Sequence, residues 1–498
     1  MGRAGPETAA ESSGWRRTST SGEVSRFLEA LKRAGLPRSR ELRTEVFGKS
    51  EEGRDLVLVR FGPAGGGRLK VLVNANIHAG EVEGKEAVQI LLRELCGGAH
   101  RQWADRLELL FVPVYNPDGN DRIDRKERNT QNGPVEGVGT RENAEGLDLN
   151  RDFLKLASAE ARALVALLAR EDPRVFMDLH TTDGSYHGFH LTYAPSLAVN
   201  VDPSLDRFER GRLLPSVREA MLERHGFHVY DYGNYKKGRD PKSGWATYDH
   251  RPRFGTNYYG LRNRLSILSE AYSHLDFETR VRVTRAFVIE CLRACAREAR
   301  EIRSLCAAAD RRAEKRGIES FRFDSRLEPP RMDTILTGKV ERIRRPDGRY
   351  TIADMDVHEA LEVPVQTAFL AGRGIPYPKA WCLTDPPAAV LEVLRLHGLR
   401  FEVLPRGRRC RVEVFEIHGL RRARRLYQGH HELRLEGGYV ERGIEVPAGA
   451  VLIPADQPLA RVAAQLLEPV SEDSLYTWEF FEVRKGGEAP TLRILDDR

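Results

Sequence analysis

The sequence has 498 residues, of which 41% are apolar and 31% are charged, and its formal net charge is +6. This composition is typical of a folded globular protein, and a chain of this length exceeds one hydrophobic core, so we expect two domains. The net charge is small for the length and gives no reason to expect a nucleic-acid partner.

The first segment, residues 1–22, is rich in glycine, serine, threonine and charge, and we interpret it as a flexible leader. It lacks the apolar stretch of a signal peptide, and no part of the chain approaches the roughly 18 apolar residues of a membrane span. Six cysteines are scattered without the spacing of metal ligands or of a disulfide framework. We therefore predict a cytoplasmic protein with reduced thiols and no membrane association.

From residue 23 to residue 315, runs of strand character alternate with runs of helical character. The first helix is expected over Val24–Leu31, where apolar residues recur at helical spacing before the stop Gly35-Leu36-Pro37. Strands are then expected at 69–77, 107–114, 175–179 and 265–268, and helices at 85–95, 159–168 and 278–312. This alternation predicts an α/β domain with a mixed, largely parallel sheet and helices on both faces.

Polar residues and Pro329-Pro330 mark the start of a second, smaller α+β domain over 330–498. Helices are expected at 388–396 and 459–467, and a half-buried strand at 411–417. The arginines of 421–425, beside His430 and His431, allow an anion or nucleic-acid patch, but the solvated flank of a hairpin is the simpler interpretation. No chemistry is predicted for this domain.

Reactive side chains stand where the apolar runs of the first domain end. His78 and Glu81 follow the run 69–77, His180 follows 175–179, Glu270 follows 265–268, and the turn Asn116-Pro117-Asp118-Gly119 follows 107–114. Catalytic groups collect beyond the carboxyl ends of strands in open α/β sheets. Two histidines and a glutamate with an open fourth position make a hydrolytic zinc site, and a second glutamate supplies the base.

Each of these residues has a simpler interpretation when it is taken alone. His78 could be a hydrogen-bonded core histidine, and Glu270 could be the ion-pair partner of Arg262 or Arg264. The combination favours the metal site, because several strand ends supply matching groups.

The set of motifs resembles the zinc carboxypeptidases of the M14 type, in particular large bacterial members with an added C-terminal domain. The resemblance covers roughly residues 14–310. It rests on His78-Ala-Gly-Glu81, Asn116-Pro-Asp-Gly119, Gly146-Leu-Asp-Leu-Asn-Arg151, Asp178-Leu-His180 and Leu268-Ser-Glu270, in this order. It implies a zinc carboxypeptidase-like catalytic domain over residues 23–315.

The resemblance also implies roles for individual residues. His78, Glu81 and His180 would bind one Zn²⁺ per chain, and Glu270 would be the general base. Arg128, with Arg125 as the second choice, would stabilise negative charge on the scissile carbonyl. The terminal carboxylate of the substrate would be held by Asn150 and Arg151, since a guanidinium binds a carboxylate with two hydrogen bonds.

Other positions leave alternatives open. Asp148 would orient a ligand histidine. The tyrosine expected over the substrate could be Tyr248, Tyr258 or Tyr259, and spacing favours Tyr248. His187 and His190 could belong to a second metal site, although pocket or structural roles are the simpler interpretation.

The leading hypothesis is a zinc metallocarboxypeptidase that hydrolyses the C-terminal peptide bond of peptides with a free carboxylate. Arg251 and Arg253 suggest a preference for acidic side chains. The alternative is a zinc amide hydrolase that acts on acylated amino acids or cell-wall peptides. A third reading, an inactive binding relative, would require a missing ligand or base, and none is missing. The oligomeric state is not predicted.

Overall fold

The computed structural model describes residues 5–63, 66–182, 184–315, 318–345 and 348–497. Its centre is an eight-stranded mixed sheet with the order β1-β2-β4-β3-β5-β10-β6-β7. The strands are β1 (Leu42–Lys49), β2 (Asp55–Phe61), β3 (Leu69–Ala75), β4 (Leu107–Val112), β5 (Val175–Thr182), β6 (Leu191–Ala194), β7 (Val229–Asp231) and β10 (Leu265–Tyr272). The central strands β4, β3, β5 and β10 run parallel, which confirms the predicted α/β class.

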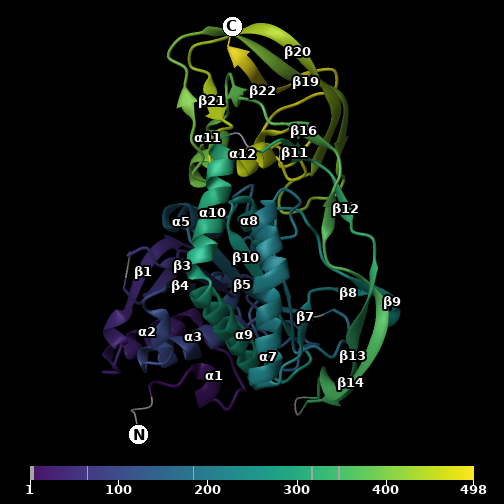
Figure 1. Ribbon diagram of the computed structural model, residues 1–498. Helices are drawn as coiled ribbons and strands as arrows, with labels where there is room; N and C mark the ends of the chain where they lie inside the picture. Colours follow the sequence, from purple (N-terminus) through teal and green to yellow (C-terminus); the bar gives the residue numbers. More distant parts are fainter. Residues whose placement is uncertain (1–4, 64–65, 183, 316–317, 346–347, 498) are drawn as a thin grey trace.

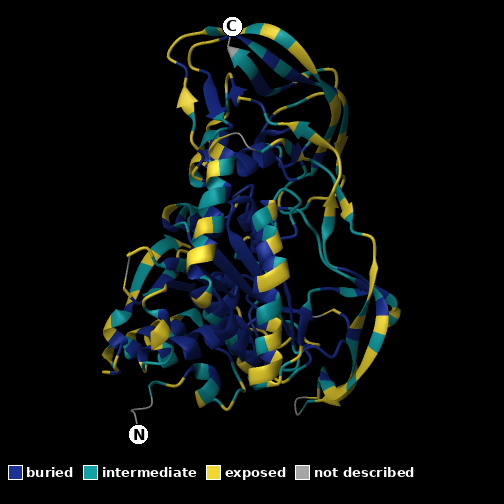
Figure 2. Cartoon of the chain, viewed as in Figure 1, coloured by how far each residue is buried: buried dark blue, intermediate teal, exposed yellow. Residues whose placement is uncertain are grey.

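Helices cover both faces of this sheet (Figure 1). One face packs against α2 (Ser21–Arg33), α3 (Glu83–Cys96), α7 (Leu214–His225), α9 (Phe277–Arg297) and α10 (Ala299–Glu314). The other face packs against α5 (Ala159–Glu171) and α8 (Gly255–Leu261). The central strands are buried on both faces, which is why they read as continuous apolar runs (Figure 2).

Helix boundaries follow local signals in most cases. Ser158 caps α5, because its side chain accepts a hydrogen bond from the backbone of Ala161. Asp152 fixes the same corner, since its carboxylate accepts from the backbone nitrogens of Ala157 and Ser158. The predicted helix over 278–312 is two helices, because the backbone leaves the helical region at Glu298 (φ −97°, ψ 11°).

The expectation of a flexible leader is wrong for residues 5–22; residues 1–4 lie outside the described residues. Helix α1 (Ala9–Ser12) forms behind a capping box made by Thr8 and Glu11. Thr18 and Ser19 donate hydrogen bonds to the buried carboxylate of Glu86 on α3. Composition could not reveal this, because the partners of these polar side chains lie about 70 residues away.

A long hairpin runs down one side of the molecule (Figure 1). It consists of β13 (Arg331–Arg344) and β14 (Tyr350–Gln366), and it joins β8 (Asn234–Lys237) and β9 (Asp240–Ala246) in a four-stranded sheet. Thr351 donates a hydrogen bond to the backbone of Gln131, and Gly338 donates to that of Tyr186. Residues of the predicted second domain thus contact the first.

The C-terminal part is built on a six-stranded antiparallel sheet, β18-β21-β17-β22-β19-β20. Its elements are β17 (Ala380–Leu383), β18 (Glu402–Val403), β19 (Arg408–Arg422), β20 (Leu433–Val446), β21 (Val451–Pro454), β22 (Glu488–Asp497), α11 (Ala388–Leu396) and α12 (Ala460–Leu467). Short pairs join β11 (Ser320–Arg322) to β16 (Gly374–Pro376), and β12 (Ser325–Leu327) to β15 (Phe369–Ala371).

This C-terminal part shares a hydrophobic core with the eight-stranded sheet. One cluster contains Leu72 and Phe176 from the central sheet together with Trp381 and Phe415 from the C-terminal sheet. The boundaries of the two domains, 23–315 and 330–498, therefore remain a prediction. Buried hydrophobic residues pack continuously from one part to the other.

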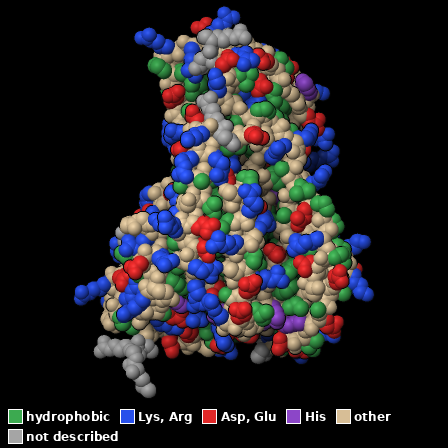
Figure 3. All heavy atoms as spheres, viewed as in Figure 1, with side chains coloured by type: hydrophobic (Ala, Val, Ile, Leu, Met, Phe, Trp, Pro, Cys, Tyr) green, Lys and Arg blue, Asp and Glu red, His purple; other side chains and the backbone are tan. Residues whose placement is uncertain are grey.

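On the face shown in Figure 3, basic and acidic side chains are interspersed over the surface. Among the described helices, none combines the length and the apolar composition that a membrane span requires.

Candidate metal centre and active site

The three predicted metal ligands meet at the carboxyl ends of β3 and β5. After β3 the chain turns at Asn76, whose φ of 63° is in the left-handed region, and this turn brings His78 and Glu81 back over the strand end. The Nδ1 atom of His180 lies 3.2 Å from Nδ1 of His78 and 3.0 Å from Oε2 of Glu81. The three side chains are almost fully buried.

The donor set fits a zinc ion. Two ligands at 2.0–2.1 Å from a tetrahedral zinc are about 3.3 Å apart, and the observed separations of 3.0–3.2 Å are close to this. Two imidazole nitrogens and one carboxylate leave a fourth position for a reactant, as catalytic zinc sites require. A buried cluster of this kind is difficult to explain as a packing arrangement, because burial of polar groups has a large cost.

A second carboxylate orients each histidine. Nε2 of His78 lies 3.0 Å from Oδ1 of Asp148, and Nε2 of His180 lies 3.1 Å from Oδ2 of Asp178. Burial raises the pKa of Asp148, but His78 and the neighbouring arginines outweigh burial and hold the pKa well below its usual range. The Asp148 carboxylate is therefore charged, and its contact with Nε2 of His78 directs Nδ1 of that ring toward the centre.

The loop that carries His78 and Glu81 is held from two sides. The side-chain amide of Asn116 donates a hydrogen bond to the backbone carbonyl of Ile77. Its side-chain oxygen accepts from the backbone of Gly119 and so caps α4 (Pro117–Asp121). A side chain at Gly80 would meet Arg128 Cδ at 2.8 Å and the Gly139 carbonyl at 2.9 Å, so only glycine allows this approach. The Asn116-Pro-Asp-Gly119 motif thus supports the metal loop.

Glu270 lies beside His180, because the two residues are paired in register on the parallel strands β10 and β5. Paired residues of adjacent strands project from the same face, so the Glu270 carboxylate stands on the metal-site face. Burial, with the charges of Glu270 and Asp178, raises the pKa of the Tyr248 hydroxyl. The Tyr248 hydroxyl is 3.0 Å from Thr256 Oγ1.

Two arginines contact the metal ligand Glu81. Arg128 donates to Glu81 Oε1 at 3.1 Å and to the carbonyl of Thr181 at 2.8 Å. Arg141 donates to the same Glu81 oxygen at 3.3 Å and to Asp148 at 2.9 Å. Arg141 is not among the residues predicted from the sequence, because its position among many arginines gives no signal before the fold is known. Its side chain is 36% exposed against 13% for Arg128.

Asn150 and Arg151 form the next turn beyond Asp148. Asn150 Oδ1 accepts a hydrogen bond from the backbone of Gly255, which ties this turn to the start of α8. The Arg151 guanidinium stacks on the ring of Phe254 at 3.9 Å and remains 20% exposed. The structure therefore brings Asn150 and Arg151 to the rim of the metal centre.

Three other candidate residues lie elsewhere. Tyr258 is fully buried, and its hydroxyl is 2.8 Å from Nδ1 of His397 in the C-terminal part. Tyr259 is also fully buried, and it bonds the carbonyl of Pro173. Arg125 is exposed on the surface. Helix α8 directs the two tyrosines into the core rather than toward the substrate, so Tyr248 is the candidate that remains.

His187 and His190 are removed from the metal centre. His187 is buried against the rings of Tyr272 and Trp245, and burial lowers its pKa to about 3. His190 Nδ1 accepts a hydrogen bond from the backbone of His228. Within the described ranges, the other group of potential ligands is Asp354, Asp356 and His358, where an ion pair already joins His358 to Asp354.

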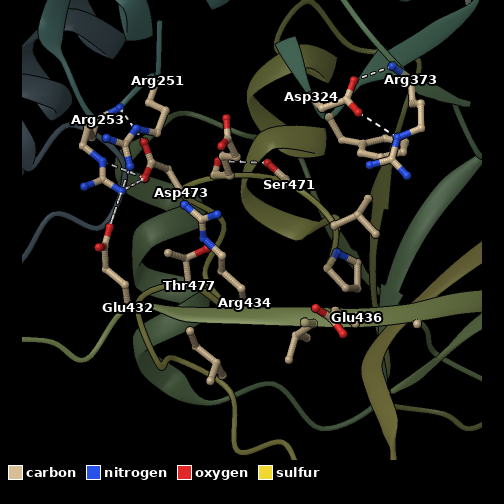
Figure 4. Close-up of a pocket in the computed structure, with 17 residues that line it drawn as sticks. Arg251, Arg253, Asp324, Arg373, Glu432, Arg434, Glu436, Ser471, Asp473 and Thr477 are labelled. Atoms are coloured by element: carbon tan, nitrogen blue, oxygen red, sulfur yellow. Dashed lines mark hydrogen bonds and ion pairs between the residues drawn. The ribbon is translucent and has the colours of Figure 1, made fainter. Parts of the chain in front are cut away.

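The charges of Arg251 and Arg253 are already paired. Arg251 bonds Asp249, and Arg253 bonds Asp473 and Glu432 of the C-terminal part (Figure 4). These contacts remove the basis for the expected preference for acidic side chains, because the guanidinium groups already have carboxylate partners.

A buried His-Glu-His centre at the carboxyl edge of a mixed α/β sheet, with a glutamate beside it, defines a metallopeptidase. Residues 28–185 match the family described as zinc carboxypeptidase. The matched segment contains His78, Glu81 and His180.

Curated relatives include carboxypeptidase 2 of Trichophyton tonsurans, which is 23% identical over 475 residues and aligns with 90% of this chain and 81% of its own length. Mouse carboxypeptidase Z is 33% identical over 142 residues, which are 26% of this chain and 21% of the relative. A metallo-carboxypeptidase structure from Burkholderia cenocepacia has 22% identity and a TM-score of 0.42, and it covers 56% of this chain and 69% of its own.

Proposed function

We propose that this protein is a zinc-dependent carboxypeptidase that releases the C-terminal residue of peptides bearing a free carboxylate. The observation that carries the proposal is the contact of Arg151 with Asp148, at 3.8 Å, because the Asp148 carboxylate in turn contacts the candidate ligand His78. A guanidinium at this place binds the terminal carboxylate, so that the last peptide bond lies over the metal centre. The match of residues 28–185 to the zinc carboxypeptidase family supports the same activity.

In this proposal the residues divide the chemistry among them. Zinc at such a centre lowers the pKa of a bound water to about 7 and polarises a carbonyl oxygen. Glu270 accepts the proton of the attacking water and passes it to the leaving amine. Asp148 and Asp178 keep the two histidines in the orientation that ligation requires. Tyr248, near Glu270, contacts the bound substrate.

Arg151→Met is expected to lower kcat/KM for a free-acid substrate by about 100-fold, since two charge-assisted hydrogen bonds are lost. The measurement compares blocked dipeptides ending in a free carboxylate with the same peptides ending in an amide. Wild type should prefer the free acid strongly, and the variant should lose most of that preference. Arg170→Met, a change on the exposed face of α5, is the control.

Equal rates on acid and amide by wild type would contradict the exopeptidase assignment. Such a result would favour the alternative, a zinc amide hydrolase on the same scaffold.

The second proposal about this site concerns negative charge on the scissile carbonyl. The guanidinium of Arg128 is occupied by Gln131, Glu81 and the Thr181 carbonyl. Arg141 is more exposed and lies beside the same ligand. We therefore propose Arg141, rather than Arg128, as the group that stabilises the oxyanion.

Arg141→Met is expected to lower kcat by about 100-fold to 1,000-fold with little change in KM, the usual effect of losing one oxyanion donor. Arg128→Met should instead weaken zinc binding, because it leaves Glu81 with fewer partners. Steady-state kinetics and zinc titration of both variants separate the two roles. A large kcat loss in the Arg128 variant alone would reverse the assignment.

A further inference from the structure

The turn between β19 and β20 crosses from the C-terminal sheet to the active site. This turn, residues 423–432, carries Gln428, whose side-chain carbonyl accepts a hydrogen bond of 2.9 Å from the backbone nitrogen of Asp148. Asp148 is buried and in turn contacts Nε2 of the metal ligand His78 at 3.0 Å. A residue 280 positions away in sequence therefore stands two contacts from the metal centre.

The turn is built to hold Gln428 in place. Tyr427 and His430 exchange backbone hydrogen bonds of 2.8 and 3.1 Å, and the two residues between them have φ values of 52° and 79°. These are the features of a tight two-residue hairpin turn, in which both central residues are left-handed. Gln428 occupies a backbone region that favours glycine, yet its side chain has a defined partner.

A second set of contacts fixes the turn to the catalytic side. The Arg253 guanidinium carbon lies 5.2 Å from the ring centre of Tyr427 and 4.8 Å from that of Trp478, and Arg253 donates to Asp473 at 2.8 Å. Figure 4 shows Arg253 pointing toward Asp473 and Glu432, beside a cavity of about 390 Å³. Arg253 immediately precedes Phe254, the ring on which Arg151 stacks.

Both partners of the Arg253–Asp473 ion pair are buried. Arg253 is 3% exposed and Asp473 is 1% exposed, and a buried ion pair becomes costly when one partner is removed. The Lys155 ammonium lies 4.9 Å from the Trp478 ring, which adds another contact across the boundary. Tyr427 and Glu432 of the turn both contact this buried arginine, so movement of the turn away from Asp148 would break these contacts.

We propose that Gln428 is a positioning residue of the metal centre, and that the C-terminal part completes the active site through it. Gln428 fixes the backbone of Asp148, Asp148 fixes the ring of His78, and His78 presents Nδ1 to the metal. This inference rests on the proposed zinc site, and it assigns a role to the C-terminal part that reaches beyond folding stability.

Three variants of one residue test the proposal. Gln428→Met keeps the size of the side chain but removes the acceptor, Gln428→Glu keeps an acceptor oxygen, and Gln428→Ala removes both. Arg425→Ala, an exposed change in the same turn, is the control. The measurements are the zinc dissociation constant, by competition with a chelator, and kcat and KM on a blocked dipeptide.

The Met and Ala variants are expected to bind zinc up to about tenfold more weakly, at the lower end of the effect of losing a direct partner of a ligand histidine. Their kcat should fall while KM stays near the wild-type value, and the Glu variant should restore both zinc affinity and kcat. Wild-type zinc affinity and kcat in both Met and Ala variants would overturn the proposal, as would a Glu variant no better than Met.

The zinc measurement keeps this test separate from the proposed activity. If wild type binds zinc but releases no C-terminal residue, the carboxypeptidase assignment fails, and the zinc affinities of the Gln428 variants still decide the positioning role. Thermal unfolding of each variant identifies any loss that comes from the fold.

Discussion

Glu270→Gln is expected to reduce kcat by about 100-fold to 10,000-fold, the range by which a positioned general base accelerates a reaction. The amide has nearly the same shape as the carboxylate but cannot accept the proton of the attacking water. Because Glu270 is paired in register with His180 but is not one of the converging ligands, zinc content should remain at the wild-type level. The measurement is steady-state hydrolysis of a blocked dipeptide, with zinc determined on the same sample.

The matched control is Glu278→Gln, on the first turn of α9 and outside the site. It should leave both kcat and zinc content unchanged. A Glu270→Gln variant with wild-type turnover would show that another group accepts the proton. Loss of zinc together with activity would instead place Glu270 among the groups that hold the metal.

His180→Ala is expected to abolish both zinc binding and hydrolysis, because it removes one of three ligands from a buried centre. The fold should survive, because the substitution leaves unchanged Leu179 and the other β5 residues that pack against α3 and α9. Zinc content after gel filtration and the thermal unfolding midpoint, each with and without added zinc, measure the effect. Zinc should stabilise wild type against unfolding and leave the variant unaffected.

Asp178→Asn gives the graded form of the same prediction. The variant keeps the hydrogen bonding of Asn74 to Oδ1 but removes the charge that faces His180, so zinc affinity should fall by about 10-fold to 100-fold. His418→Ala, a change at an exposed histidine of β19, is the control. Stoichiometric zinc in His180→Ala would contradict the assigned ligand set.

Much of the central fold could be predicted, because each core strand is buried on both faces and appears as an uninterrupted apolar run. The strands at 69–75 and 175–182 and the capping of α5 by Ser158 follow from such local signals. The positions of His78, Glu81 and His180 also follow, since each stands where such a run ends and parallel strands bring their carboxyl ends to one edge.

The remaining parts of the site depend on contacts between distant residues. Spacing along the chain could not show that α8 turns Tyr258 into the core against His397, or that Arg253 is paired with Asp473. Arg141 and Gln428 lack a local pattern of their own. Gln428 is of interest only because it accepts a hydrogen bond from Asp148, and no periodicity or motif in the sequence connects these two residues.

The segment around residues 421–425 is a further example of what composition can and cannot predict. Its arginines are the solvated flank of the β19–β20 hairpin, as predicted, and they are exposed. The residue that contacts the active site follows them by three positions in an uncharged stretch, where sequence composition gives no reason to look. The proposed role of Gln428 depends on how the β19–β20 turn places its side chain, and not on the charge of the neighbouring arginines.

The most direct test of the account is zinc content measured together with hydrolysis of a panel of blocked dipeptides by the wild-type protein. The account predicts about one zinc per chain, as three ligands with an open fourth position imply, and release of the C-terminal residue only from peptides with a free carboxylate. A protein without zinc, or one that holds zinc and releases no residue from any free-acid peptide, would contradict it.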